Sequence, residues 1–220
     1  LAARGSVRPR DGDVFEFRIT EDATRVVYGA SEVAGIGLHS APIDSSGSSV
    51  FLTPGMTTFD DPLALTADRV VFRGRAQGTT RDELFSTPIA GGGPVTVVSH
   101  GAGHGEVTVE DDFALTAGGV RAVFRSDAFV DGKLELFSAP VDGSAAPAQL
   151  SLAMPDAADV AEFLLSPDGA DVAWRADSSV GGRSDLYVTP SDGSALASVL
   201  AVPAAEEDVN RLLLFDPDGE

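Results

Sequence analysis

The stretch FLLSPDGADVAWRADSSVGGRSDLYVTPSDG, from Phe163 to Gly193, decides the fold of this chain. It holds three short apolar runs, at 163–165, 172–174 and 186–188, separated by Gly, Pro, Asp and Ser residues. Short runs rich in Val, Leu and aromatic residues, with turn-forming residues at both ends, are typical of β-strands. The segment therefore predicts three strands joined by turns.

The same pattern occurs four times along the chain. The aromatic residue that ends the second run is one marker of the repeat, and it falls at Tyr28, Phe72, Phe124 and Trp174. The proline that follows the third run is another marker, and it falls at Pro42, Pro88, Pro140 and Pro190. The aromatic steps are 44, 52 and 50 residues and the proline steps are 46, 52 and 50. Two markers with nearly the same stride indicate an internal repeat, and a fifth copy opens at 213–219.

Each repeat adds a fourth apolar run after its proline, so a unit of about 40–50 residues supplies four strands, as in one blade of a β-propeller. The sequence predicts an all-β fold, a β-propeller of four-stranded blades with four complete repeats and the start of a fifth. We expect an arc of a ring of roughly six to eight blades, with a closed four-bladed ring as the alternative. The expected boundaries are a lead-in at 1–14, which is open to being part of a preceding blade, blades at about 15–56, 61–102, 111–154 and 160–203, and a fragment at 209–220.

The fourth repeat resembles the TolB-like propeller repeat in its turns and strands, at Ser166–Gly169, Val172–Trp174, Asp185–Tyr187 and Ser191–Gly193. This repeat occurs in TolB, in tricorn protease and in the propellers of prolyl-oligopeptidase-type enzymes, and the resemblance extends from about Phe15 onward. It implies the propeller fold and a periplasmic, secreted or cell-surface setting, but it says little about function. The Ser-Pro-Asp-Gly turn is degenerate in the first three repeats, which sets the chain apart from TolB itself.

The chain is strongly acidic, with 34 Asp and Glu residues against 15 Lys and Arg residues and a net charge of -19. Such a surface repels phosphate backbones and anionic lipids, which argues against nucleic-acid and membrane partners and favours a basic protein partner. Salt adaptation and the residue usage of a GC-rich genome are alternative explanations of the acidity. The chain has no cysteine, which excludes disulfides and thiolate chemistry. It starts at Leu1 and stops at Glu220 just after a turn signal, and we expect both ends to be cut.

An arginine follows the aromatic marker in three repeats, and an acidic residue follows ten positions later. These residues are Arg73 with Glu83, Arg125 with Glu135, and Arg175 with Asp185. In the first repeat both are absent, because Gly29 and Gly37 occupy the two positions. We interpret them as structural pairs across the hairpin between the second and third strands. The alternative is an anion-binding ring of arginines.

Acidic residues also gather where one repeat runs into the next, at Asp13, Asp61, Asp111, Asp112, Glu162 and Asp208 among others. Carboxylates in such a rim could bind a hard cation such as Ca²⁺, and a solvated rim that aids solubility is the alternative. The pair His100 and His104 with Glu106 has the ligand types for zinc, but the surrounding glycines predict a loop rather than a helix that would align them. We therefore predict no firm metal site and no cofactor.

No catalytic constellation stands out, since the chain lacks a Gly-x-Ser-x-Gly elbow, a phosphate loop and a dinucleotide fingerprint. The sequence favours a non-catalytic scaffold that binds another protein through the loops at 73–81, 125–132 and 175–183. One alternative is the substrate-gating propeller of a serine peptidase whose hydrolase domain lies outside this chain. Another is a calcium-stabilised extracellular structural module.

Overall fold

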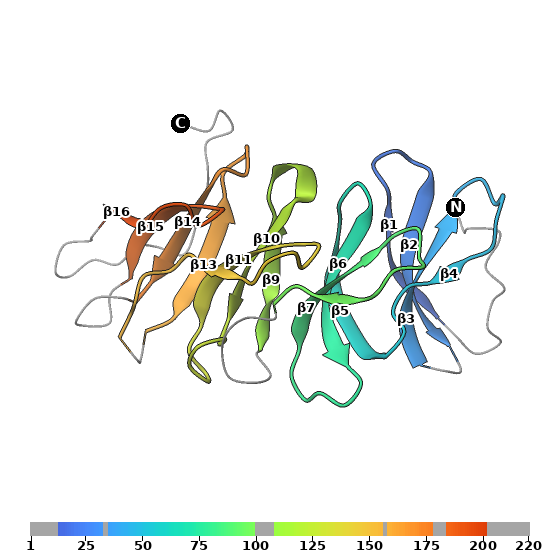
Figure 1. The fold of residues 1–220 in the computed structure, drawn as a ribbon, viewed down its shortest axis with the longest axis horizontal. Coiled ribbons are helices and arrows are strands. Elements are labelled where there is room, and N and C mark those ends of the chain that lie inside the picture. Colours follow the sequence, from blue (N-terminus) through green and yellow to red (C-terminus); the bar gives the residue numbers. More distant parts are fainter. Residues whose placement is uncertain (1–12, 33–34, 100–107, 156–157, 178–183, 202–220) are drawn as a thin grey trace. The chain divides into compact units, whose positions relative to one another are not determined.

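The computed structural model describes residues 13–32, 35–99, 108–155, 158–177 and 184–201. These residues form sixteen strands in four antiparallel sheets, each of four strands in chain order, together with one short 3-10 turn (Figure 1). The all-β fold of four-stranded blades is confirmed. No helix of the described residues is long and apolar enough to cross a membrane.

The blades follow one another along the chain. Blade 1 consists of β1 (Val14–Ile19), β2 (Arg25–Glu32), β3 (Gly35–Pro42) and β4 (Val50–Phe51). Blade 2 consists of β5 (Met56–Leu65), β6 (Arg69–Ala76), β7 (Glu83–Pro88) and β8 (Thr96–Val97). Blade 3 consists of β9 (Val109–Leu115), the 3-10 turn η1 (Ala117–Gly119), β10 (Arg121–Ser126), β11 (Glu135–Pro140) and β12 (Ala148–Gln149). Blade 4 consists of β13 (Val160–Leu165), β14 (Asp171–Ala176), β15 (Asp185–Pro190) and β16 (Ser198–Ala201).

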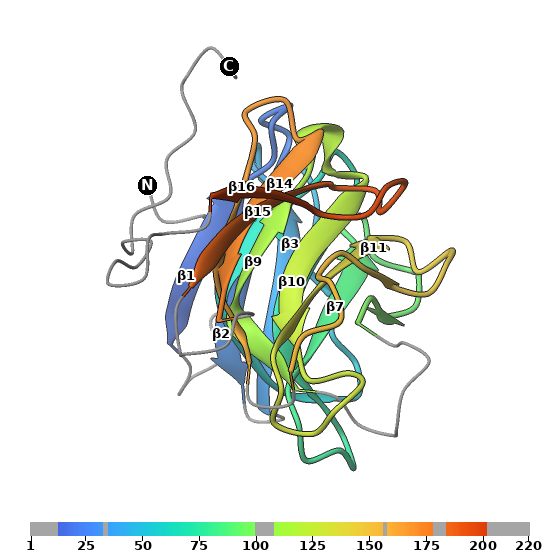
Figure 2. The ribbon, with the colours of Figure 1, turned by 90° about the vertical axis from the view of Figure 1, so that its left-hand side faces the viewer.

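The chain divides between Val98 and Ser99 into two compact units. Blades 1 and 2 form the first unit, and blades 3 and 4 form the second. The sheets have the twist expected of β-strands, and in blade 4 the edge strand β16 is rotated away from β14 (Figure 2). Strand β5 starts at Met56, before the expected blade start at 61, and its pairing with β6 shifts register at two places.

Each blade has two faces, because successive side chains of a strand point to opposite sides of the sheet. We call the face that carries the aromatic marker the leading face. In blade 4, Phe163, Trp174 and Tyr187 lie opposite one another in register on this face. The other face, which we call the trailing face, carries small and aliphatic residues such as Ala173 and Leu186.

The core of each unit lies between a trailing face and the leading face of the next blade. In the second unit, Val123, Leu136 and Leu150 of blade 3 pack in one cluster with Trp174 and Tyr187 of blade 4. The equivalent residues of the first unit are Val27, Leu38 and Leu52 of blade 1 with Phe72 and Phe85 of blade 2. Complete burial of one such side chain is worth about 1.5–3 kcal/mol, so this packing is the main force that joins neighbouring blades.

At one position of the repeat, a buried threonine forms a hydrogen bond across each of these interfaces. The Thr189 hydroxyl donates to the Leu150 carbonyl at 3.3 Å and accepts a hydrogen bond from Trp174 Nε1 at 2.9 Å. In the first unit, the Thr87 hydroxyl donates to the Leu52 carbonyl at 3.3 Å, but the neighbouring aromatic residue is Phe72, which has no ring N–H to donate. The two threonines therefore differ by one hydrogen bond.

This difference predicts unequal costs for the same substitution. Thr189→Val leaves the buried Trp174 N–H and Leu150 carbonyl without this partner and should cost about 2–4 kcal/mol of unfolding free energy. Thr87→Val loses a single bond and should cost about 1–2 kcal/mol. Urea unfolding followed by circular dichroism measures both variants. Equal losses would show that the Trp174 bond contributes nothing to the interface.

Candidate functional site

The three arginines singled out in the sequence lie in the second half of the second strand of blades 2, 3 and 4, and each contacts an acid on the first strand. Arg73 Nη1 donates to Asp60 Oδ2 at 2.6 Å, and Arg175 Nε donates to Glu162 Oε1 at 2.9 Å. Arg125 Nε reaches both carboxylate oxygens of Asp112 at 3.0 Å. Each acid comes thirteen residues before its arginine.

The predicted partners of these arginines, Glu83, Glu135 and Asp185, are therefore wrong. In the hairpin of blade 3, Arg125 lies opposite Leu136, whereas Glu135 lies opposite Ser126. Neighbouring residues of a strand project to opposite faces, so Arg125 and Glu135 lie on opposite sides of the sheet. The same register holds in the other two blades, where the leucines Leu84 and Leu186 lie opposite Arg73 and Arg175.

The three predicted acids are instead buried on the leading faces. Glu83, Glu135 and Asp185 are 7%, 4% and 5% exposed. Glu135 Oε1 accepts a hydrogen bond from Gln149 Nε2 at 3.0 Å and lies 3.8 Å from Lys133 Nζ. Burial raises the pKa of the Glu135 carboxyl, and the Lys133 ammonium and the Gln149 amide oppose this rise. Lys133, the only lysine of the chain, is itself buried and donates to the Met154 carbonyl at 2.7 Å.

An irregularity in the first strand accompanies the arginine position in every blade. The pairing of the first two strands shifts between Phe15 and Phe17 in β1, between Asp60 and Ala64 in β5, opposite Arg125 in blade 3, and between Val160 and Glu162 in β13. A bulge leaves backbone groups outside the ladder of hydrogen bonds. Arg125 Nη1 donates to two carbonyls at the irregularity of the next blade, Val160 O at 3.1 Å and Ala161 O at 2.9 Å. Arg125 thus joins blade 3 to blade 4.

Blade 1 replaces this arginine with an aromatic contact. Gly29 occupies the arginine position, and the rings of Phe15 and Phe59 stack over it with centroids 5.4 Å apart. A Cβ at Gly29 would collide with Phe59 and would come within 2.8 Å of Phe15. The acid of the pair persists as Glu16, which forms an ion pair with Arg18 of the same strand. The aromatic stack therefore explains why the arginine is absent.

The predicted acidic rim divides into members with different roles. Asp112 and Glu162 are bound to arginines, whereas Asp13 and Asp111 are exposed. The Asp61 side chain and the whole of Asp208 lie outside the described residues. Within the described part of the chain, no three His, Cys, Asp or Glu residues are grouped so that they could hold a metal ion. Calcium binding at the rim stays a prediction.

Of the three histidines, His39 alone lies among the described residues. His39 lies between Tyr28 and Phe51 on the leading face of blade 1, with ring centroids 5.4 and 5.2 Å away. His100, His104 and Glu106 lie outside the described residues.

A second series of arginines was not found from the sequence. Arg25, Arg69 and Arg121 begin the second strands of blades 1, 2 and 3. Their Nε atoms donate to serine hydroxyls of the third strand, at Ser40 (2.7 Å), Ser86 (3.0 Å) and Ser138 (2.8 Å). A fixed spacing in the sequence could have revealed this series. Each arginine comes three residues before the aromatic marker, and each serine comes two residues before the proline marker. Blade 4 has lost both partners together, with Asp171 and Val188 in their places.

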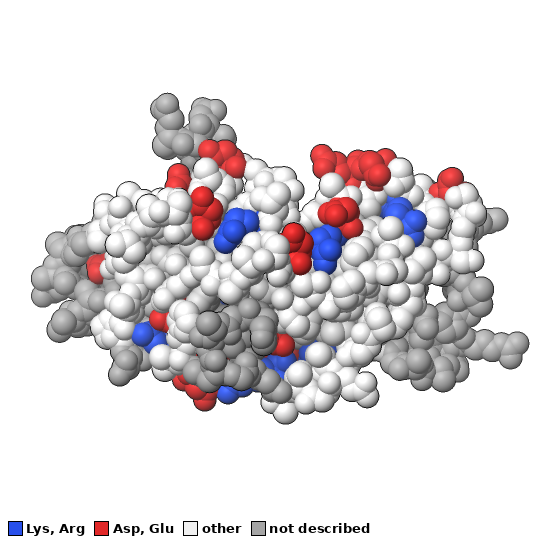
Figure 3. Space-filling view, in the orientation of Figure 1, with Lys and Arg blue, Asp and Glu red and all other residues white. Residues whose placement is uncertain are grey.

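Aspartates in the turns between strands present fixed negative charge. The pKa values of Asp22, Asp44, Asp168 and Asp192 are lowered, chiefly by hydrogen bonds from a nearby Ser or Thr side chain and from backbone N–H groups. All four side chains are exposed, so they stay ionised at neutral pH. Figure 3 shows acidic side chains along the edge of the molecule where the turns of the first unit lie.

Double-mutant cycles test the corrected arginine pairs. Combining Arg125→Met with Asp112→Asn should give a coupling of about 1 kcal/mol or more in unfolding free energy, because the two groups share hydrogen bonds. Combining Arg125→Met with Glu135→Gln should give less than about 0.5 kcal/mol, because the side chains lie on opposite faces. Chemical denaturation of the three single and two double variants, beside the unchanged chain, measures both values. A larger coupling to Glu135 than to Asp112 would reinstate the hairpin pair.

A glycine substitution tests the aromatic contact of blade 1. Gly29→Ala should cost about 1–3 kcal/mol, because its methyl group cannot fit beside the two stacked rings. Gly47→Ala is the matched control, since its Cβ meets only Pro42 at 3.4 Å or more. Thermal unfolding measures both, and the account fails if Gly29→Ala is as stable as Gly47→Ala.

Comparisons with known proteins agree with the geometry of the blades. No protein-family model matches the sequence, and no curated protein matches it. Among solved structures, an oligogalacturonate lyase in complex with manganese superposes with a TM-score of 0.56 at 13% identity, over 93% of this chain and 57% of that one. The β-propeller domain of the Trilobed protease from Pyrococcus furiosus gives 0.53 at 10%, over 89% and 56%. TolB from Acinetobacter baumannii gives 0.50 at 16%, over 94% and 47%.

The chain thus spans about half the length of the propeller proteins it resembles. Identities this low show the fold and leave the activity open. The four blades therefore have the β-propeller fold.

Proposed function

We propose that this chain is a non-catalytic propeller domain that binds another protein through the loop between β10 and β11. The observation that carries the proposal is the loop at 127–134, whose base is buried and whose tip exposes two large apolar residues. Phe129 is 40% exposed and Val130 is 43% exposed. Exposed apolar side chains held on an ordered loop are typical of a binding surface rather than of a solvated turn.

Hydrogen bonds at the base hold this loop in one conformation. Asp127 is 4% exposed, and its carboxylate accepts bonds from the backbone N–H groups of Thr108 at 2.6 Å and Gly132 at 3.3 Å. The backbone N–H of Lys133 donates to the Val130 carbonyl at 2.9 Å. The Phe129 ring packs against the Phe137 ring, with centroids 5.4 Å apart. A loop ordered before binding loses little conformational entropy when a partner docks.

The charge around the tip favours a basic partner. Asp131 in the tip is exposed, and the chain carries a net charge of -19. Arg125 at the start of the loop is neutralised by Asp112 and so does not oppose a basic surface. Apolar contacts at the centre with charges around them are the usual composition of a protein interface.

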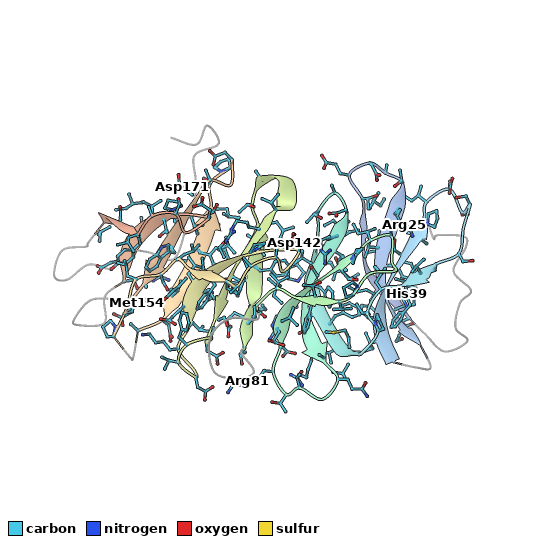
Figure 4. All side chains as sticks on the ribbon, in the orientation of Figure 1. Arg25, His39, Arg81, Asp142, Met154 and Asp171 are labelled. Carbon is cyan, nitrogen blue, oxygen red and sulfur yellow. The ribbon has the colours of Figure 1, made fainter. Side chains whose placement is uncertain are left out.

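The loop lies at one end of the blade, away from the turn aspartates. Figure 4 places Met154, near the base of this loop, and Asp171, at the start of β14, toward opposite ends of the second unit. In the first unit, Arg81 in the corresponding loop of blade 2 and Arg25 at the start of β2 are likewise at opposite ends (Figure 4).

The proposed setting is periplasmic, secreted or at the cell surface, in keeping with the resemblance to TolB-like repeats. The proposal that the domain is not itself an enzyme is supported by the use of its polar groups. The arginines that could bind an anion are already bound to Asp60, Asp112 and Glu162. These contacts stabilise the blades.

Site-specific crosslinking tests the proposal, and the absence of cysteine from the chain makes it simple. Val130→Cys labelled with a photoreactive maleimide should form a discrete crosslinked species in an extract of the cells that make the protein. Leu196→Cys is the matched control, since this residue is 85% exposed in the turn between β15 and β16.

Excess unlabelled protein should suppress the Val130→Cys product, and excess of a Phe129→Ser, Val130→Ser, Asp131→Lys variant should not. The proposal is wrong if both positions give the same products, or if the triple variant competes as well as the unchanged chain.

A further inference from the structure

The trailing face of blade 4 is exposed at positions that are buried in the other blades. Leu38, Leu84 and Leu136 occupy one position of the repeat and are all 0% exposed, whereas Leu186 occupies it in blade 4 and is partly exposed. The leucine or valine that comes ten residues after the proline marker behaves in the same way. It is at most 2% exposed in blades 1, 2 and 3, but Leu200 in blade 4 is 58% exposed. Apolar side chains that gather on one exposed face indicate an interaction site.

An arginine on the same face has donors that its counterpart in blade 3 uses across a blade interface. Arg125 Nη1 donates to two carbonyls at the start of β13, the first strand of the next blade. Arg175 occupies the same position in blade 4, and its contacts in the described part of the chain are with Glu162 and Ser184 of its own blade. A following first strand would supply the carbonyl groups that this arginine lacks.

The first strand and turn of blade 4 show how such a strand sits on the blade before it. The Val160 N–H donates to the Leu134 carbonyl of blade 3 at 2.9 Å, and Phe163 packs against the cluster that the two blades share. The turn that follows comes so close to blade 3 that a Cβ at Gly169 would lie 2.3 Å from the Ala117 backbone nitrogen. This contact between blades therefore requires glycine in the turn.

The conformation of the turn does not by itself require glycine. In blade 1 the equivalent residue is Ala23, which adopts a φ of 55° and so carries a Cβ in the left-handed region. Gly219 has the equivalent position in the fifth repeat, fifty residues after Gly169. The fifth repeat thus carries the residue that a turn needs when it lies against a preceding blade.

We propose that residues 210–219 dock on the trailing face of blade 4 as the first strand and turn of a fifth blade. A step of fifty residues carries the two carbonyls of β13 onto Asn210 and Arg211, which accept hydrogen bonds from Arg175. The run of three leucines and a phenylalanine at 212–215 supplies the apolar side chains that cover the exposed leucines of blade 4. The occupant of this face is therefore the chain's own continuation.

Thiol reactivity of the whole chain tests the docking, because the chain has no cysteine of its own. Leu200→Cys should react with a water-soluble maleimide at least about tenfold more slowly than Leu196→Cys, whose position in the neighbouring turn is 85% exposed. Adding Leu213→Asp with Phe215→Asp should restore fast reaction at residue 200, because charged side chains cannot cover an apolar face. The rate at residue 196 should not change, and emission from the buried Trp174 checks that blade 4 keeps its fold.

A photoreactive maleimide on Leu200→Cys identifies the occupant. Trypsin cuts after Arg211, so a crosslink to the peptide 212–220 shows that the fifth repeat lies on this face, and Leu196→Cys should give no such crosslink. Docking of 210–219 does not involve the loop at 127–134, so the proposed binding function is tested separately.

Equal reactivity of the two cysteines overturns the docking of the fifth repeat. Protection of residue 200 that survives Leu213→Asp with Phe215→Asp overturns it as well. A dependence of that protection on protein concentration would then identify a second copy of the chain as the occupant.

Discussion

The burial of one blade's aromatic row against the aliphatic face of the blade before it is the interaction on which the rest of this structure depends. A single four-stranded sheet with two apolar faces cannot keep both of them from water. In both described interfaces the solution is the same, since Leu38 or Leu136 packs with a pair of stacked rings. This requirement explains the repeat in the sequence, because every blade must supply one aromatic face and one aliphatic face.

The polar groups of the repeat serve the same interface. The first strand of each blade is bulged beside the arginine position, and a bulge leaves carbonyl groups that the ladder does not satisfy. Arg125 binds the acid of its own first strand and two carbonyls of the next blade's bulge. Where the arginine is missing, at Gly29, two phenylalanine rings fill the same space. Two chemically different contacts thus hold adjacent blades at one position of the fold.

The parts of the structure that follow from local pattern could be predicted from the sequence, and those that depend on register could not. Strand number, repeat length and fold class follow from the spacing of the Tyr28 and Pro42 series. The arginine partners were missed because a spacing of ten residues does not reveal which residues of a hairpin face each other, and a shift of one residue moves a side chain to the other face. The true partner, thirteen residues before the arginine, lies on a bulged strand whose extra residues obscure the pairing. The exposure of side chains also could not be predicted. No local feature of the sequence distinguishes Phe17, which is exposed, from Phe113 and Phe163, which are partly buried.

Tryptophan fluorescence on variants of the repeated leucine tests most directly whether the aromatic row is held by the preceding trailing face. Trp174 is the only tryptophan, is 0% exposed and stacks on Tyr187 at the interface of blades 3 and 4. Leu136→Ala removes a blade 3 side chain that packs in one cluster with Trp174, whereas Leu186→Ala changes the same repeat position in blade 4, where the side chain is partly exposed. Leu136→Ala should lower the free energy of unfolding by about 2–5 kcal/mol, and Leu186→Ala should lower it clearly less. Urea unfolding followed by Trp174 emission measures both. Equal costs for the two variants, or a larger cost for Leu186→Ala, would contradict the account.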